Sequence, residues 1–326
     1  MSAKQWVRWL APVAVIVALL VFFRDQLPFL GEARAALRSV TWPPLAAATL
    51  TAVAAMSAMA GVMQILLNVE GRIASPAGTN ALVYAANAWS TTIPGGPAFA
   101  TWFAFRVNRS WGASVGLSGW FVVVSGALSA VWMVVIGLGA VVLLGADLSV
   151  ASLAASLAAA VLTMAALFWA TRHPEPLKRW FPGRFADVID QIAAIRVSAA
   201  EFCAAAALSL LNQLLDVATM FFSVWAVLGS APGLRAGLNE TTIMGVALAY
   251  IMTKLAGSAQ VTPGGLGTVE PVAVGMLVAG GMTLVDATAA TAIYRAVSFA
   301  MITAIGWVVF AAVYAGRGFM IGKTPE

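Results

Sequence analysis

An apolar stretch with a break in its middle occupies residues 241–281, which read TTIMGVALAYIMTKLAGSAQVTPGGLGTVEPVAVGMLVAGG. Pro263 removes a backbone N–H donor, and Gly264, Gly265 and Gly267 permit backbone angles that other residues avoid. Irregular backbone at membrane depth is tolerated only where protein buries it or where it lines a wet cavity. The stretch therefore predicts a helix, a break and a second helix from near Thr268, as a re-entrant hairpin or as two full spans.

A second broken stretch covers residues 80–105, where Pro94-Gly95-Gly96-Pro97 interrupts apolar text. The arms on either side of this break are too short to cross the bilayer, so the stretch should enter the membrane and return. The helix that follows each break presents free N–H groups and the positive end of its dipole, which suit a phosphate or carboxylate. One break alone is equally well explained as a plain helical hairpin. Two breaks at corresponding positions favour a binding site.

The composition places most of the chain in lipid. Hydrophobic residues make up 61% of the 326 positions and charged residues only 10%, whereas about a quarter of a soluble domain is charged. We therefore predict a single integral membrane domain over residues 1–326. The net charge of +5 does not indicate a nucleic-acid partner, because the basic residues lie between apolar runs. Cys203 is the only cysteine, which excludes an internal disulfide.

Six unbroken apolar runs are long enough, or nearly so, to cross about 30 Å of hydrocarbon. The first follows Lys4 and Arg8 and resembles a signal peptide, but its nearest small-residue cleavage site lies well downstream, so we expect an uncleaved helix. The fold class is thus all-α, with six transmembrane helices and two broken hairpins. The predicted spans are residues 10–23, 43–68, 114–144, 149–171, 200–229 and 287–316.

The distribution of Lys and Arg favours cytoplasmic N- and C-termini in a cell membrane, because cytoplasmic segments carry an excess of these residues. With this orientation the outside segments hold only Arg24, Arg34, Arg38 and Arg235. The inside segments hold Lys4, Arg8, Arg72, Arg106, Arg109, Arg172, Lys178, Arg179, Arg184, Arg196, Arg317 and Lys323.

The order of elements also predicts an internal repeat with inverted topology. Two helices, a broken hairpin and a helix occur in residues 1–145 and again in residues 146–326. An odd number of crossings separates the two breaks, so the first hairpin enters from inside and the second from outside. Inverted repeats are common in alternating-access transporters. The charged loop 172–199 between the halves is predicted to be an amphipathic stretch on the inner face.

Four ionisable residues lie within apolar runs: Asp216, Lys254, Glu270 and Arg295. Such residues are costly in lipid and usually have a function. The two acids can each neutralise one of the bases, and two explanations stay open. Buried ion pairs would hold the second hairpin in register. Alternatively, Lys254 and Arg295 bind a lipid phosphate while Glu270 or Asp216 titrates or gates.

The string PGGLGTVE at residues 263–270, followed by Gly280-Gly281 and Tyr294-Arg295, resembles the lysylphosphatidylglycerol synthase transmembrane-region family. That family includes the flippase domain of the multiple peptide resistance factor. The resemblance covers nearly the whole chain and implies a domain that moves lipids or lipid-linked groups between leaflets. The first break lacks the acidic residue that many relatives have, so a symmetric mechanism with two carboxylates is not expected. By carry-over, the candidate site residues are Pro263, Gly264, Gly265, Gly267, Glu270 and Arg295.

We therefore predict a flippase or transporter for a phospholipid or another phosphate-linked lipid, with Lys254, Asp216, Pro94, Gly95 and Gly96 completing the site. A membrane enzyme acting on a lipid or polyprenyl head group is the alternative, as is a membrane partner protein without transport activity. Enzyme chemistry is not favoured, because aminoacyl transfer in such proteins belongs to a separate soluble domain and only residues 317–326 follow the last predicted helix. No cofactor or metal is predicted, since His173 is the only histidine. A homo-oligomer is compatible with the sequence.

Overall fold

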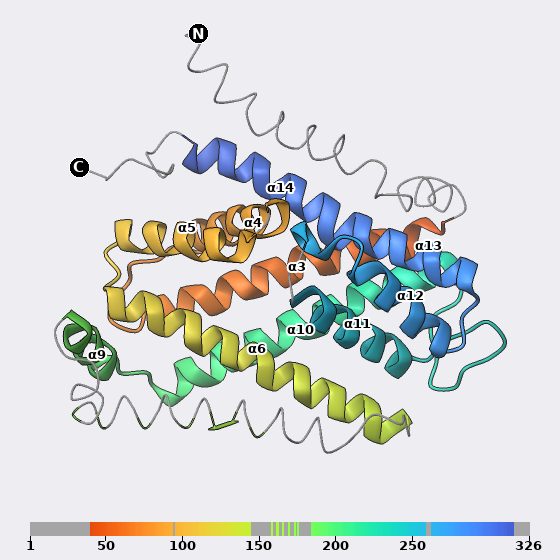
Figure 1. Ribbon diagram of the computed structural model, residues 1–326, viewed down its shortest axis with the longest axis horizontal. Coiled ribbons are helices and arrows are strands. Elements are labelled where there is room, and N and C mark those ends of the chain that lie inside the picture. Colours follow the sequence, from red (N-terminus) through yellow and green to blue (C-terminus); the bar gives the residue numbers. More distant parts are fainter. Residues whose placement is uncertain are drawn as a thin grey trace, which may run out of the picture. The chain divides into compact units, whose positions relative to one another are not determined.

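The computed structural model describes residues 40–93, 95–144, 184–258 and 262–315, together with single positions between 158 and 175. Within these ranges every regular element is a helix, and strand pairing is limited to one isolated bridge between Gly233 and Thr242. The elements, drawn in Figure 1, are α3 (Trp42–Leu67), α4 (Pro76–Thr92), α5 (Gly96–Ser110), α6 (Val115–Leu144), α9 (Arg184–Ala194), α10 (Ala199–Leu228), α11 (Ile243–Ser258), η2 (Pro263–Gly265), α12 (Val269–Ala279), α13 (Leu284–Arg295), η3 (Ala296–Met301), α14 (Ile302–Val309) and η4 (Phe310–Tyr314).

Four helices of the described residues are long and apolar enough to cross a membrane: Trp42–Leu67, Val115–Gly139, Ala199–Leu228 and Leu284–Tyr314. They correspond to four of the six predicted spans. The other two predicted spans, residues 10–23 and most of 149–171, lie outside the described residues. Large apolar side chains on these helices remain exposed, among them Leu50 (69%) and Val308 (68%), as expected where a helix faces lipid. The protein is therefore an all-helical, multi-pass membrane protein.

Proline and glycine lie at several helix boundaries. Pro43 lies in the first turn of α3, where its missing N–H costs no hydrogen bond. α10 ends before Gly229, whose φ of 72° is the left-handed conformation that commonly follows a helix. α12 ends before Gly280, and Gly281 has a φ of 110°.

The chain forms two compact units that are discontinuous in sequence. The first comprises Met1–Ala54, Ala81–Phe103 and Leu214–Glu326, and the second comprises Ala55–Asn80 and Ala104–Gln213. Helices α3, α4, α5 and α10 contribute residues to both. The predicted repeat with halves 1–145 and 146–326 stays a prediction.

In the second unit, polar side chains join helices through backbone atoms. The Trp132 indole on α6 donates a 2.9 Å hydrogen bond to the Ala206 carbonyl on α10. The Gln191 carboxamide on α9 accepts a 2.8 Å hydrogen bond from the Gly116 N–H at the start of α6. α9 exposes Asp187 and Asp190, with partly buried Ile189 between them. α9 lies within the charged loop 172–199, and the amphipathic character of that loop and its place at the inner face stay predictions.

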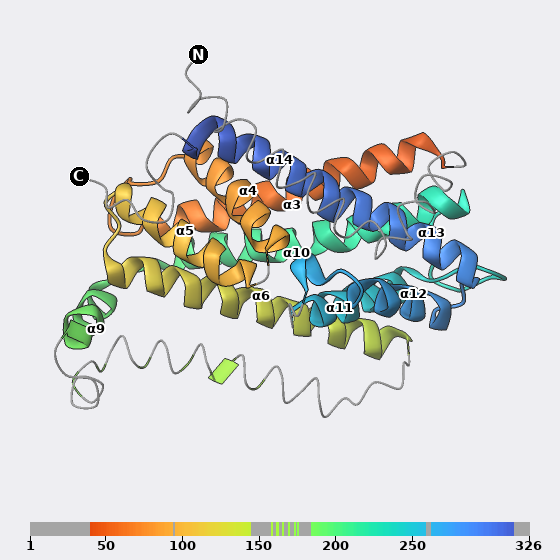
Figure 2. The same cartoon turned by 45° about the horizontal axis from the view of Figure 1, so that its top comes forward.

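In the first unit, α11 and α12 pack side by side, and α12 packs against α13 (Figures 1 and 2). The long helix Leu284–Tyr314 includes two π-helical segments, η3 and η4. π-Helical turns are rare and often lie at functional sites. Here η3 begins directly after Arg295, one of the four candidate ionisable residues.

Candidate functional site

The described part of the second break, residues 262–268, is a tight turn that leads into α12. Gly264, Gly265 and Gly267 have φ values of 57°, 67° and 81°, a region that other residues rarely adopt. A Cβ atom on Gly264 would lie 2.2 Å from the Phe299 ring, so this glycine also permits a close approach of the backbone to η3. The predicted break is therefore present, and α12 begins at Val269, one residue after the predicted start.

Arg295 is buried beside this break, with 8% of its side chain exposed. Its Nη2 donates a 2.8 Å hydrogen bond to the Gly264 carbonyl. Its Nε lies 2.8 Å from Glu270 Oε1. The Nε–H does not point at that oxygen, so the contact is an ion pair without a well-aligned hydrogen bond. The Phe299 ring lies 4.4 Å from the guanidinium carbon, which adds a cation–π contact.

Glu270 connects Arg295 to the start of α12. Its second oxygen, Oε2, accepts a 2.7 Å hydrogen bond from the Gly267 N–H. A carboxylate in the first turn of a helix satisfies a free N–H group and interacts favourably with the helix dipole. The positive end of α12, predicted to face a ligand, is thus already close to an anion that the protein itself supplies.

The other two candidate residues form a second network between α10 and α11. Lys254 Nζ lies 3.1 Å from Asp216 Oδ2 and donates a 2.6 Å hydrogen bond to the Tyr250 hydroxyl. The same hydroxyl donates a 3.0 Å hydrogen bond to Asp216. The Lys254 and Asp216 side chains are 34% and 31% exposed, so this pair is more accessible than Glu270 and Arg295. The residues of both pairs lie in the first compact unit.

The first break has a similar local geometry. Gly95 has a φ of 70°, and a Cβ atom on Gly96 would lie 2.2 Å from the Ser90 carbonyl oxygen, so the chain reverses closely there. Pro94 lies outside the described residues. The two threonines before this break contact the final helix. Thr91 shares a 2.9 Å hydrogen bond with Thr303, and Thr92 accepts a 3.0 Å hydrogen bond from the Trp307 indole.

Both breaks therefore contact the long final helix at positions four residues apart: Arg295, Phe299, Thr303 and Trp307. The first two contact the Gly264 turn and the last two contact the residues before Gly95. The contacts therefore place these four residues along one side of the final helix, which includes the π-helical segment η3. Only Arg295 of this row is among the site residues predicted from the sequence. The spacing of the other three, and of Tyr250 four residues before Lys254, is the sequence signal that identifies them.

A model of the lysylphosphatidylglycerol synthase transmembrane region matches residues 9–306. The chain belongs to this family. The match covers most of the chain, including both breaks and the four ionisable residues, as the PGGLGTVE string at residues 263–270 predicted. None of the curated proteins compared with this family member matches it significantly.

Proposed function

We propose that this protein moves an anionic or phosphate-linked lipid between the leaflets of the cell membrane. Its membership in a lipid-related membrane family supports this function. The observation that carries the proposal is the buried contact of Arg295 with Glu270 and the Gly264 carbonyl at the second break. An arginine inside a transmembrane segment costs about 3 kcal/mol or more unless it is paired or hydrated, so its presence needs a reason.

The arginine retains capacity for a ligand. Nε and Nη2 contact Glu270 and Gly264, whereas Nη1 has no hydrogen-bond partner among the residues that the structure describes. A guanidinium binds two phosphate oxygens at once. In this mechanism a phosphate oxygen displaces Glu270 Oε1 from Arg295, and Glu270 Oε2 retains the Gly267 N–H. The phosphate then replaces the Glu270 carboxylate as the negative charge beside Arg295. The buried guanidinium therefore keeps an anionic partner throughout.

In this mechanism the other candidate residues shape the two turns or gate access to the site. Pro263, Gly264, Gly265 and Gly267 form the turn that brings backbone oxygen to Arg295, and Pro94, Gly95 and Gly96 form its counterpart. The more accessible Asp216 and Lys254 pair opens to admit the head group. Movement follows from a shift of population between inward-facing and outward-facing states, and the ligand drives it only by binding the two states differently.

The membrane topology completes the proposal: six spans, two re-entrant hairpins in an inverted repeat, and cytoplasmic termini. Two related broken hairpins entering from opposite sides would give the site access to each leaflet in turn. Contacts of both breaks with the final helix support this arrangement, because one helix then responds to changes at either break. A homo-oligomer is compatible with this arrangement.

The decisive experiment is reconstitution of the full chain into vesicles with fluorescently labelled anionic and zwitterionic lipids in one leaflet. Leaflet exchange without chemical change, lost in Arg295→Lys, is the expected result. Conversion of the lipid head group would indicate a membrane enzyme instead. Neither exchange nor conversion in correctly folded protein would favour a partner protein without transport activity.

A further inference from the structure

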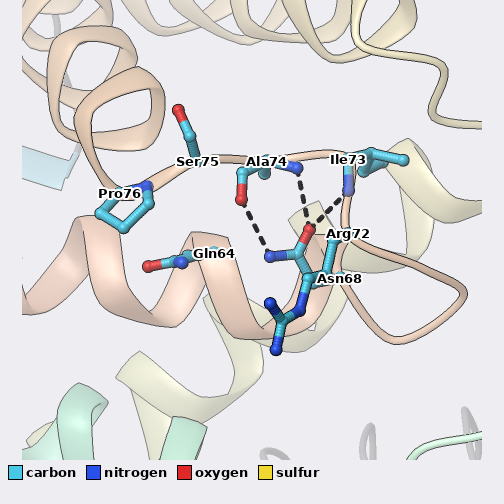
Figure 3. Close-up of a pocket in the computed structure, with 7 residues that line it drawn as sticks. All are labelled: Gln64, Asn68, Arg72, Ile73, Ala74, Ser75 and Pro76. Carbon is cyan, nitrogen blue, oxygen red and sulfur yellow. Dashed lines mark hydrogen bonds between the residues drawn. The ribbon is translucent and has the colours of Figure 1, made fainter.

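A recess of about 590 Å³ lies in the second unit, where the chain passes from α3 to α4 (Figure 3). This volume is in the range of ligand sites, which are typically about 300–1,000 Å³. The recess is lined by Gln64, Asn68, Arg72, Ile73, Ala74, Ser75 and Pro76. It shares no residue with the Arg295 site.

The loop that forms one wall is held by the side chain of Asn68. Its Oδ1 accepts hydrogen bonds of 2.9 and 2.8 Å from the N–H groups of Ile73 and Ala74, and its Nδ2 donates a 2.9 Å bond to the Ala74 carbonyl. Figure 3 shows these three bonds closing the loop onto the end of α3. Because Asn68 makes three hydrogen bonds to the loop, it fixes the wall, and only one Nδ2 hydrogen is left for a ligand.

Two other polar side chains at the recess are available to bind a ligand. Arg72 pairs with no acidic side chain in the described part of the chain, and the Gln64 carboxamide has no partner among the described residues. Arg72 extends back alongside Asn68 toward the end of α3 (Figure 3). Ser75 Oγ accepts a 3.1 Å hydrogen bond from the Gly78 N–H, so its own hydroxyl hydrogen is available. The recess therefore offers a cation and neutral hydrogen-bond donors.

The position of the recess favours a lipid. It lies where the apolar span Trp42–Leu67 ends, and its other walls are the apolar groups of Ile73, Ala74 and Pro76. Pro76 has no N–H and the Gly78 N–H already donates to Ser75 Oγ, so the first turn of α4 has few free donors for an anion. Glu70 is exposed two residues before Arg72. Its negative charge repels an anion and so lowers the affinity of the recess for an anionic ligand. Basic recesses at the ends of transmembrane helices are suited to phospholipid head groups.

We propose that this recess binds a phosphate-ester group, with Arg72 as the charged ligand and Gln64 and Ser75 as neutral donors, and that its source is the head group of an anionic phospholipid. Arginine is suited to this role because its planar fork pairs with two phosphate oxygens. The site is separate from the proposed transport site, and binding there requires no lipid movement.

The test is native mass spectrometry of the full chain in a neutral detergent, titrated separately with phosphatidylglycerol, phosphatidylcholine and glycerol phosphate. We expect Arg72→Gln to weaken phosphatidylglycerol binding about tenfold, since a hydrogen-bonded charge pair is lost. The matched control is Arg196→Gln, which removes the same charge from another exposed arginine and should change binding by less than about twofold. Phosphatidylcholine should depend less on Arg72 than phosphatidylglycerol does, because its choline cation offsets the charge of its phosphate.

Both comparisons are repeated in an Arg295→Lys background, so that lipid bound at the proposed transport site does not affect the result. Persistence of the Arg72-dependent lipid in that background supports a separate site, whether or not the protein moves lipid. Equal losses in Arg72→Gln and Arg196→Gln would show diffuse surface attraction and overturn the proposal. Arg72-dependent binding of glycerol phosphate alone would retain the phosphate-ester site and assign it a soluble ligand.

Discussion

The Nη2 atom of Arg295 donates a 2.8 Å hydrogen bond to the carbonyl oxygen of Gly264, a residue 31 positions earlier in the chain. The same guanidinium forms an ion pair with Glu270 in the first turn of α12. One side chain of the long final helix therefore connects the turn with the start of α12. Any movement of the turn relative to that helix must break or exchange these contacts, which is why Arg295 and its neighbours are the natural subjects for mutation.

Replacement of Gly264 by alanine should destabilise the protein more than the same change at Gly267. Both glycines have positive φ, so each variant incurs about 1–2 kcal/mol of backbone strain. At Gly264 the new Cβ also lies 2.2 Å from the Phe299 ring, whereas nothing lies within 4 Å of a Cβ at Gly267. The extra cost at Gly264 should be about 1–3 kcal/mol, as for other overpacked sites. Thermal unfolding in detergent measures the difference.

The Phe299→Leu change provides a control for that comparison. In the Gly264→Ala background it should recover part of the lost stability, because the smaller side chain relieves the clash but leaves the backbone strain. Equal melting temperatures for Gly264→Ala and Gly267→Ala would contradict the proposed close contact.

Replacement of Arg295 by lysine should reduce leaflet exchange about tenfold or more while the protein still inserts, because a point charge replaces the fork that binds phosphate. Arg196→Lys, at an exposed arginine, is the matched control and should leave exchange unchanged. The vesicle assay measures the exchange, and unfolding in detergent checks that both variants remain folded.

The double variant Arg295→Met with Glu270→Leu distinguishes a phosphate ligand from a structural ion pair. Apolar replacement of a buried pair often costs little stability, so a purely structural pair should tolerate it. The variant also removes the donor to the Gly264 carbonyl, so its stability is measured alongside transport. Full leaflet exchange by a stable double variant would exclude Arg295 as the phosphate ligand.

The Asp216 and Lys254 pair should show energetic coupling in a double-mutant cycle. Lys254→Met alone leaves the Asp216 carboxylate without its cation and should cost about 1 kcal/mol, a modest value because both side chains are about one-third exposed. Lys254→Met with Asp216→Leu should cost less than the sum of the single changes. Tyr250→Phe, which keeps both charges and removes the bridging hydroxyl, is the comparison variant. Additive costs would contradict an interacting pair.

Single-cysteine labelling should show that the two breaks are reached from opposite sides of the membrane. Cys203, which is exposed, is first replaced by serine. Ile93→Cys should then label from the cytoplasmic side and Leu266→Cys from the outside. Exposed Ser198 and Leu238, on the predicted inner and outer sides, provide cysteine reference positions. Labelling of both breaks from the same side would contradict the inverted repeat.

The sequence by itself determined the class of protein and the places where helices stop. Composition placed the chain in lipid, and the length of each apolar run predicted the four spans that the described residues contain. Pro263 and Gly264 predicted the break, because proline lacks a donor and glycine tolerates positive φ whatever its neighbours. Apolar run length and the backbone preferences of proline and glycine depend only on neighbouring residues, so the sequence alone shows them. The Pro-Gly-Gly string also identified the family.

Only the tertiary structure decided which charges pair and what packs beside them. Glu270 lies closer in sequence to Lys254 than to Arg295, yet it pairs with Arg295, and Lys254 pairs with Asp216. Apolar runs define where helices begin and end but not how they rotate about their axes or which helices become neighbours. Those choices follow from packing between distant segments, as in the close contact of Phe299 with Gly264. The partners of a buried charge are therefore fixed by the packing of the whole unit and not by its neighbours in sequence.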